Sequence, residues 1–350
     1  MISVKKRIIA QNMEYPYAVK TVSSADGMKV FTATELDGLC LKYSDDGKVE
    51  ETVWASLGGT MNICPIKEDC EFLAIQKFYR GFNGLESLIA HVEKKNGIWT
   101  SKPYIRLPFI HRCCVVESVK KRYILVCQLC QNKKDVDDWS FAGSVYISEI
   151  DGNWDKTPEL RLLIPGIHKN HGLLHHTLNG EEVVMISGTE GLFAIHIPQT
   201  DEEEWTVRKL IEREISDMCV ADIDGDGTDE LITIEGFHGA TLAVNKLVGG
   251  EWEIVYTYPA QFLHALWGGM IFDKPGILVG YRGLNAALLY MHCSGEKDGE
   301  LMMDVQLIDE HEGPTNIDVL HEKDKMKIFA CSGAKKRVMM YELKKTEAYP

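Results

Sequence analysis

Long apolar runs are missing from this chain of 350 residues. No stretch approaches the roughly 20 consecutive apolar residues that a membrane-spanning helix needs. The first residues, MISVKKRIIAQ, contain no apolar run of the length found in a signal peptide. We therefore expect no membrane association and a cytoplasmic location.

Clustered positive charge and paired cysteine motifs are also scarce. The 38 Lys and Arg residues are outnumbered by 52 Asp and Glu residues, giving a net charge of −14. Without a basic stripe to neutralise phosphates, nucleic acid is not expected as a partner. Of the ten cysteines, Cys127 and Cys130 form a lone CxxC that has no second pair, so no zinc ribbon is predicted. No P-loop, dinucleotide fingerprint, HExxH motif or nucleophile elbow is present.

The chain does contain a repeat built from short β-rich segments, separated by Gly, Asp and Asn. Each unit comprises a short strand, a polar turn, a buried strand, a Gly-containing loop and two further strands. Successive units begin 43 to 60 residues apart. They start at Tyr17, Thr60, His111, His171, Ser216, His264 and Thr315. Because a four-stranded propeller blade takes about 40–50 residues, the repeat predicts an all-β, seven-bladed β-propeller that forms one domain over residues 1–350.

The two ends of the chain predict how the ring closes. The last unit has only three strands, whereas Ser3–Gln11, before the first unit, resembles the fourth strands of other units. We expect Ser3–Gln11 to complete the last blade, which would cover a sheet edge otherwise open to aggregation.

One turn carries a recognisable motif. Residues 222–231, DIDGDGTDEL, resemble the repeat of FG-GAP/VCBS-type propellers, in which an aspartate-rich turn joins the first two strands of a blade. The corresponding turns of the other units are degenerate. The oxygens of Asp222, Asp224, Asp226 and Glu230 suit a calcium ion. The same residues also suit a tight turn that binds no ion.

Propeller topology predicts which face carries function. The first strand of each blade lines the central channel, and the loops entering it lie on the same face as the loops between second and third strands. The aspartate-rich turn lies on the opposite face. His111, His171 and His264 occupy equivalent positions at strand starts, so we expect them to converge at the channel mouth. Nearby loops add polar and aromatic residues, namely Lys77, Tyr79, Arg80, Arg112, Trp139, His238, Tyr281 and Arg282.

Converging histidines support two kinds of chemistry, or none. Neutral imidazoles can bind zinc or manganese, for which His111, His171 and His264 are the candidate ligands. Alternatively, they can move protons near neutral pH, with His238 and Tyr281 as further catalytic candidates. Lys77, Tyr79, Arg80, Arg112, Trp139 and Arg282 are the candidate substrate-binding residues, since Arg can grip a carboxylate and aromatic faces suit sugar rings. The histidines can also be no more than polar channel lining.

These features favour a carbohydrate-active lyase or dehydratase that performs β-elimination on a uronide or keto-sugar, with or without a metal. The alternative is a non-catalytic propeller that binds a glycan or a protein partner. The loops differ strongly between units, which favours one central site over repeated peripheral ones. The long segment Gln128–Gly143 is a lid, a contact for a partner, or a solvated loop.

Overall fold

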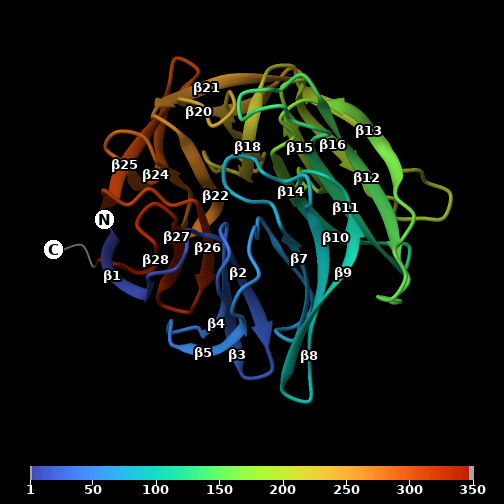
Figure 1. Ribbon diagram of the computed structural model, residues 1–350. Helices are drawn as coiled ribbons and strands as arrows, with labels where there is room; N and C mark the ends of the chain where they lie inside the picture. Colours follow the sequence, from blue (N-terminus) through green and yellow to red (C-terminus); the bar gives the residue numbers. More distant parts are fainter. Residues whose placement is uncertain (1, 347–350) are drawn as a thin grey trace.

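The chain folds as a ring of seven antiparallel sheets, each of four strands, in a computed structural model that describes residues 2–346. All 28 regular elements of this part of the chain are β-strands, and none of its residues forms a helix that could span a membrane. Figure 1 shows the sheets arranged around a central axis as the blades of a propeller. The predicted seven-bladed β-propeller is therefore confirmed.

The blades follow one another along the chain. Blade 1 contains β2 (Pro16–Ser24), β3 (Gly27–Thr34), β4 (Cys40–Ser44) and β5 (Val49–Trp54). Blade 2 contains β6 (Ile63–Lys67), β7 (Glu71–Gln76), β8 (Leu88–Lys95) and β9 (Ile98–Arg106). Blade 3 contains β10 (Ile110–Ser118), β11 (Lys121–Cys130), β12 (Ala142–Ile150) and β13 (Arg161–Ile167). Blade 4 contains β14 (Gly172–Leu178), β15 (Glu181–Gly188), β16 (Gly191–His196) and β17 (Val207–Ile211).

The remaining blades repeat this order until the ring closes. Blade 5 contains β18 (Ile215–Ala221), β19 (Glu230–Glu235), β20 (Thr241–Val248) and β21 (Glu251–Pro259). Blade 6 contains β22 (Leu263–Ile271), β23 (Lys274–Tyr281), β24 (Ala287–Lys297) and β25 (Glu300–Glu310). Blade 7 contains β26 (Asn316–His321), β27 (Met326–Ser332), β28 (Arg337–Lys345) and β1 (Ile2–Gln11).

Residue patterns follow the depth of each strand in its blade. The second strands, such as β15 with the sequence EEVVMISG, are apolar over several consecutive residues and buried on both faces. A strand packed between two neighbouring sheets has no solvated face, so it does not alternate. Outer strands such as β9, IWTSKPYIR, carry more exposed and charged residues because one edge meets water. The hydrophobic core therefore lies between adjacent blades.

The N-terminal strand closes the ring, as the sequence predicted. Strand β1 pairs antiparallel with β28, from Ile2 opposite Lys345 to Gln11 opposite Arg337. The two strands lie side by side at the rim in Figure 1. The observed strand begins one residue before the predicted range Ser3–Gln11. Thus the first and last strands of the chain form one sheet.

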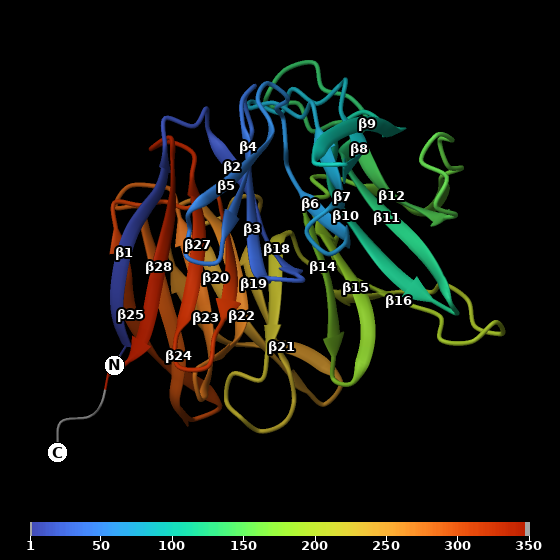
Figure 2. The same cartoon turned by 90° about the horizontal axis from the view of Figure 1, so that it is seen from below.

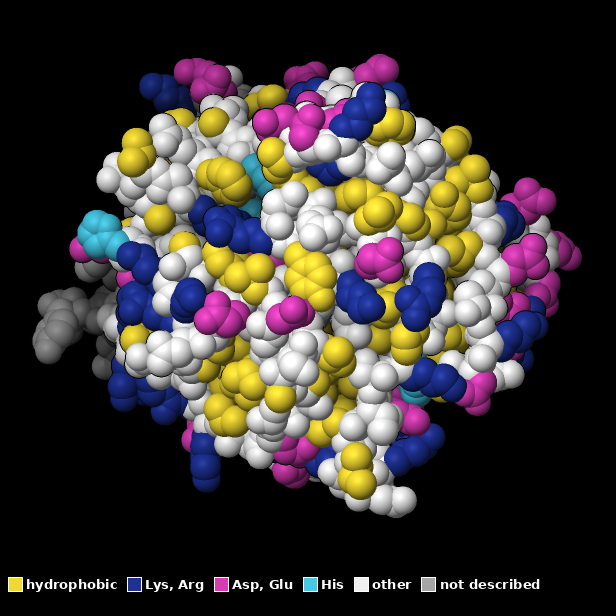
Figure 3. Space-filling model, in the orientation of Figure 1, with side chains coloured by type: hydrophobic (Ala, Val, Ile, Leu, Met, Phe, Trp, Pro, Cys, Tyr) yellow, Lys and Arg dark blue, Asp and Glu magenta, His cyan; other side chains and the backbone are white. Residues whose placement is uncertain are grey.

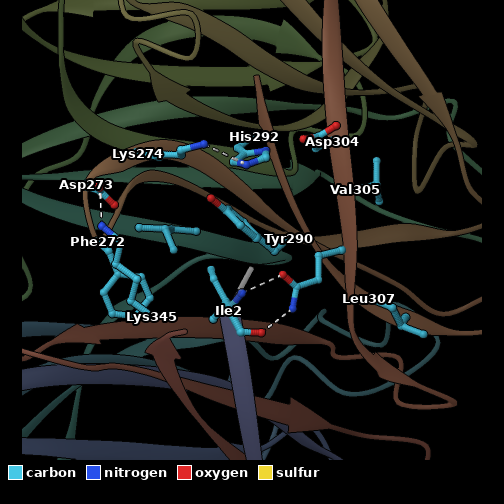
Figure 4. A pocket seen from close by; sticks show the side chains of 12 residues that line it. Ile2, Phe272, Asp273, Lys274, Tyr290, His292, Asp304, Val305, Leu307 and Lys345 are labelled. Atoms are coloured by element: carbon cyan, nitrogen blue, oxygen red, sulfur yellow. Dashed lines mark hydrogen bonds and ion pairs between the residues drawn. The ribbon is translucent and has the colours of Figure 1, made fainter. Parts of the chain in front are cut away.

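A cavity of about 500 Å³ lies at the seam between β25 and β1. Figure 4 shows its walls, including Ile2, Tyr290 and Leu307. The side-chain amide of Gln306 accepts a hydrogen bond from the Ile2 N–H at 3.2 Å and donates one to the Ile2 carbonyl at 2.7 Å. Gln306 therefore satisfies the backbone of Ile2 at the point where blade 6 meets the closing strand.

The seven innermost strands begin on one side of the ring, which we call the entry face (the upper side in Figure 2). Strands β2, β6, β10, β14, β18, β22 and β26 contact one another in order around the axis. Loops that join second and third strands reach the same face. Residues at these strand starts and in these loops therefore share one end of the central channel.

β-Bulges recur at the starts of four innermost strands. In β2, β10, β18 and β22 one residue has no partner on the neighbouring second strand, and these residues are Tyr17, His111, Ser216 and His264. A bulge bends its strand and redirects the side chain of the extra residue. Four of the seven repeat positions identified from the sequence are therefore bulge positions, aimed differently from the residues that follow them.

Candidate functional site

Four histidines meet on the entry face, near the axis. One ligand nitrogen from each of His171, His238 and His264 lies within 4.8 Å of the other two. The ring centroids of His171 and His238 are 5.0 Å apart, and those of His238 and His264 are 5.1 Å apart. His111 adjoins this group, with its ring centroid 4.4 Å from that of His171. The predicted convergence of histidines is thus present in the structure.

The three residues that could share a metal ion differ from the predicted set. We expected His111, His171 and His264, whereas His238 takes the place of His111 in the group. His238 belongs to the loop between β19 and β20, where its backbone is left-handed with φ of 47°. Its ring stacks between Phe237, at 4.2 Å, and Phe262, at 4.8 Å. Loop conformation and stacking therefore bring His238 to the cluster, which strand alignment alone does not reveal.

Hydrogen bonding fixes the tautomer of His171. Its Nδ1 lies 3.0 Å from the main-chain oxygen of Ser216. A carbonyl oxygen only accepts hydrogen bonds, so Nδ1 carries the proton and Nε2 keeps a free lone pair. That Nε2 is buried and has no hydrogen-bond partner. On His264, Nε2 lies 3.4 Å from the hydroxyl of Tyr17, whereas Nδ1 is buried without a partner. Each of these two rings therefore has one buried nitrogen without a hydrogen-bond partner.

The cluster is uncharged at neutral pH. Burial lowers the pKa of His111, His171 and His264 well below the usual histidine range. Burial, followed by the positive charges of Arg282 and Arg112, lowers the pKa of His238 to about 3. Neutral imidazoles offer lone pairs to a metal ion or to a donor group, but groups with such low pKa values are weak bases.

His111, His238 and His264 border a central cavity of about 350 Å³, and His171 lies behind them, outside its lining. The space-filling view of the entry face shows a recess above and to the left of the centre, in which histidine is visible beside basic side chains (Figure 3). The lining mixes aromatic rings, three of the predicted basic and aromatic residues, and carboxylates. It comprises Tyr17, Glu35, Met61, Phe78, Arg80, Gly81, Phe82, His111, Val136, Asp137, Trp139, Phe237, His238, Phe262, His264 and Arg282.

Two arginines face this cavity without a carboxylate partner. The guanidinium of Arg80 stacks over Tyr15, 4.4 Å from the ring centroid. That of Arg282 stacks over Phe262 at 4.7 Å and donates a hydrogen bond to the Tyr15 hydroxyl at 3.2 Å. Within residues 2–346 neither arginine forms an ion pair. Their charges are therefore available to an anionic ligand.

Arg112 is engaged differently. It donates a hydrogen bond to the Met61 carbonyl at 3.3 Å and lies 4.0 Å from a carboxylate oxygen of Asp217. Burial raises the pKa of Asp217 to about 6, although the charge of Arg112 opposes the rise. Arg112 thus supports the channel below the histidines and is not among the residues that line the central cavity.

The sequence reasoning missed a carboxyl group in the cavity wall, that of Glu35. Burial raises the pKa of Glu35 to about 7, against the opposing effects of Arg282 and Arg80. A group that titrates near neutral pH is suited to accept and release protons. Glu35 follows β3, in a loop between second and third strands, so the rule that selected Arg80 and Arg282 also covers it.

Five residues predicted for this face are absent from the cavity lining, namely His171, Arg112, Lys77, Tyr79 and Tyr281. Lys77 is exposed to solvent and Tyr79 hydrogen-bonds to Asp37. Tyr281 packs on the core cluster between blades 5 and 6, and burial raises its pKa. Successive side chains of an extended strand point in opposite directions. The residues next to one that faces the cavity, such as Tyr79 beside Arg80 and Tyr281 beside Arg282, therefore point away from it.

The predicted lid segment does reach the cavity. Strand β11 extends to Cys130 and β12 begins at Ala142, so the connecting loop spans residues 131–141. Its residues Val136, Asp137 and Trp139 line the cavity. Trp139 packs edge-on against Phe82 and Phe237, with ring centroids 5.0 and 4.9 Å away. The loop therefore forms part of the wall, while most of its other residues face solvent.

The aspartate-rich turn lies on the opposite face, between β18 and β19, as its topology predicted. Asp222, Asp224 and Asp226 present oxygens within 4.8 Å of one another, a geometry able to hold a metal ion. Glu230 is fully buried, its Oε2 accepts a hydrogen bond from the Ile223 N–H at 2.6 Å, and its Oε1 has no partner.

A lysine already supplies positive charge to this turn. The ammonium of Lys246, on β20, forms ion pairs with Asp224 and, at 2.8 Å, with Asp226. These carboxylates raise the pKa of Lys246, so it stays protonated. A calcium ion at the turn would compete with this ammonium group for the same oxygens.

Comparison with known proteins bears on the fold alone. No family model matches the chain, and no curated protein matches it either. A solved protein from Lactobacillus plantarum shares 14% identity at a TM-score of 0.54, with 93% of this chain and 94% of that chain covered. A candidate 6-phosphogluconolactonase from Bacteroides fragilis shares 12% identity at 0.51, with 93% of each chain covered. A PQQ-bound aldose sugar dehydrogenase from Streptomyces coelicolor shares 12% identity at 0.48, with 98% of this chain and 99% of that chain covered.

Proposed function

We propose that this protein is a carbohydrate-active lyase or dehydratase that removes a proton and a leaving oxygen from an acidic sugar in the central cavity. The observation that carries the proposal is the placement of Glu35, whose pKa is about 7, in one cavity with His111, His238, His264 and two arginines that form no ion pair among the described residues. A β-elimination uses all three: a base for the proton, a group that binds the acid, and a centre that stabilises the developing charge.

The roles follow from charge and burial. The carboxylate of the substrate would lie against Arg80 and Arg282, which form no ion pair with any carboxylate of the described residues. Glu35, in its ionised form, takes the proton from the carbon next to that carboxylate. Tyr17, whose pKa burial raises to about 12, keeps its proton and can give it to the departing oxygen. The electron pair of the broken C–H bond becomes the new C=C bond as the C–O bond breaks.

The histidines serve better as ligands than as bases. His171 presents an unprotonated, buried Nε2, and His238 and His264 lie beside it. A zinc or manganese ion held there would stabilise the negative charge that develops on the substrate carboxylate. The donor set of three neutral nitrogens suits either ion. This assignment replaces the proton-transfer role that the sequence suggested for these histidines.

A sugar is preferred as substrate because the cavity combines aromatic faces with cationic groups. Trp139 and Phe82 supply the apolar surface. Its volume of about 350 Å³ is at the lower end of the ~300–1000 Å³ range of ligand pockets. The similar fold described as a candidate 6-phosphogluconolactonase is named for a sugar-acid substrate, but at 12% identity it does not bear on this choice.

The test is turnover of uronides and keto-sugars, followed by the ultraviolet absorbance of the unsaturated product, with zinc or manganese added. We expect activity on at least one acidic sugar, lost in Glu35→Gln and kept in His175→Ala, a surface histidine on β14 paired with Glu182. Absence of any unsaturated product across the panel, with either metal, would overturn the lyase assignment in favour of a binding propeller.

A further inference from the structure

A second cavity opens on the entry face next to the central one. Its volume is about 420 Å³, and it lies between the turn before β2, blade 6 and the last loop of blade 7. Arg80, Phe262 and Arg282 line both cavities. A ligand in one cavity therefore shares a wall with a ligand in the other.

That wall is built so that both guanidinium groups are held in place. Tyr15 lies under Arg80 and accepts a hydrogen bond from Arg282, while Phe262 lies under Arg282. Tyr15 and Phe262 both have left-handed backbones, with φ of 61° and 59°. Such conformations are costly for aromatic residues and are retained where the surrounding structure requires them. Two backbones in this state therefore support two arginines that have no ion-pair partner in the described chain.

The second cavity has a cationic and polar lining. None of the residues lining it carries a carboxylate. Lys335 lies at its edge, and in residues 2–346 it too lacks an ion pair. The hydroxyl of Ser332 is buried, without a hydrogen-bond partner. A buried, unsatisfied hydroxyl beside three cationic side chains favours a ligand that brings both negative charge and hydrogen-bonding groups.

We propose that the two cavities are consecutive subsites for an acidic oligosaccharide. One acidic sugar occupies the central cavity, and its neighbour in the saccharide chain occupies the second, with Arg80 and Arg282 binding the anionic group at the junction. This inference rests on the proposed function and adds that the substrate has at least two sugar units. Carboxylate and phosphate share the anionic chemistry that the arginines recognise, so the experiment includes both.

The experiment compares binding by calorimetry and turnover for galacturonate, digalacturonate, the neutral disaccharide maltose and glucose 6-phosphate. Ala334→Trp fills the second cavity from an exposed position, far along the chain from every histidine of the cluster. Asp324→Trp places the same side chain in an exposed turn of blade 7 on the opposite face and is the matched control. Arg80→Lys keeps the charge but removes the planar fork.

We expect digalacturonate to bind the wild-type protein about tenfold or more tightly than galacturonate. The second sugar unit would add one or two charge-assisted hydrogen bonds, and the monosaccharide lacks them. Ala334→Trp should abolish this preference and leave galacturonate unaffected, Asp324→Trp should preserve it, and Arg80→Lys should weaken every acidic sugar but not maltose.

Equal affinity for galacturonate and digalacturonate would overturn the second subsite, even if galacturonate is turned over. Glucose 6-phosphate binding as tightly as digalacturonate in both the wild type and Ala334→Trp would overturn it as well, since one anionic sugar would then suffice. Conversely, the protein could prefer digalacturonate, lose that preference in Ala334→Trp, and form no unsaturated product. That result would support the second subsite and overturn the lyase proposal.

Discussion

Ser216 positions two histidines of the cluster at once. Its main-chain oxygen accepts a hydrogen bond from Nδ1 of His171 at 3.0 Å, and its hydroxyl accepts one from the main-chain N–H of His238 at 3.2 Å. Ser216 is the bulged residue of β18, so its carbonyl and side chain point away from the normal ladder. One irregular residue therefore sets the tautomer of one histidine and the loop position of another.

Metal uptake should depend on the histidines that the structure groups, and not on the set that strand alignment suggests. We expect the protein to take up one zinc or manganese ion, measured by elemental analysis after dialysis. His171→Ala, His238→Ala and His264→Ala should each reduce affinity by more than the roughly 10–100-fold typical of losing a supporting residue. His111→Ala should have a smaller effect, and His175→Ala none. Equal metal content in all five variants would contradict a site at this cluster.

Activity should rise with pH through about 7 if Glu35 is the base. Its raised pKa means that the carboxylate needed for proton removal forms only as pH rises through that value. Arg80 and Arg282 face Glu35 and lower its pKa, whereas Tyr17 nearby stays neutral. Arg282→Gln should therefore move the rising limb of kcat/KM to higher pH. Glu35→Gln should lower kcat by about 10²–10⁴-fold.

A flat pH profile between 5 and 9 would exclude Glu35 as the base. Glu35→Asp serves as the control, because it keeps a carboxylate. It should retain part of the activity, and its kcat/KM should also rise with pH. A limb that falls with pH would instead assign the protonated form of Glu35 as the active one.

The repeat and its closure were predictable, because they depend on spacing and on strand patterns that recur along the chain. The histidine positions were also predictable, since equivalent residues of a closed ring lie around one axis. His238 was named as a catalytic candidate on the same face, but its place in the metal-binding group was not predicted, because it depends on a left-handed loop residue and on stacking against Phe237 and Phe262. Glu35 was missed for a related reason: its distinguishing property is its burial, which no local pattern reveals.

Lys246 should control calcium binding at the aspartate-rich turn. With the lysine present, its ammonium satisfies Asp224 and Asp226, so we expect calcium to leave the melting temperature of the wild type nearly unchanged. Lys246→Met leaves the carboxylates unpaired and should melt earlier in EGTA. Calcium at 100 times its Kd would then restore about 2.7 kcal/mol. Lys344→Met, on the exposed end of β28, is the control and should show neither effect. A large calcium shift in the wild type would mean that the ion displaces Lys246.

The closing strand should be indispensable for stability, because β1 supplies the fourth strand of blade 7 and packs Ile2 and Val4 against the core between blades 6 and 7. A chain without residues 1–11 exposes the edge of β28 and loses the packing of two half-buried apolar side chains, each worth less than the roughly 1.5–3 kcal/mol of a fully buried one. We expect it to melt at a lower temperature and to aggregate, as judged by thermal unfolding and size-exclusion chromatography.

Adding a peptide of residues 1–11 should raise the melting temperature again, since it can pair with the open edge. Gln306→Ala, which removes only the two side-chain hydrogen bonds to Ile2, should cost about 1 kcal/mol and keep the protein monodisperse. If the shortened chain melts like the full one, ring closure by β1 contributes nothing to stability.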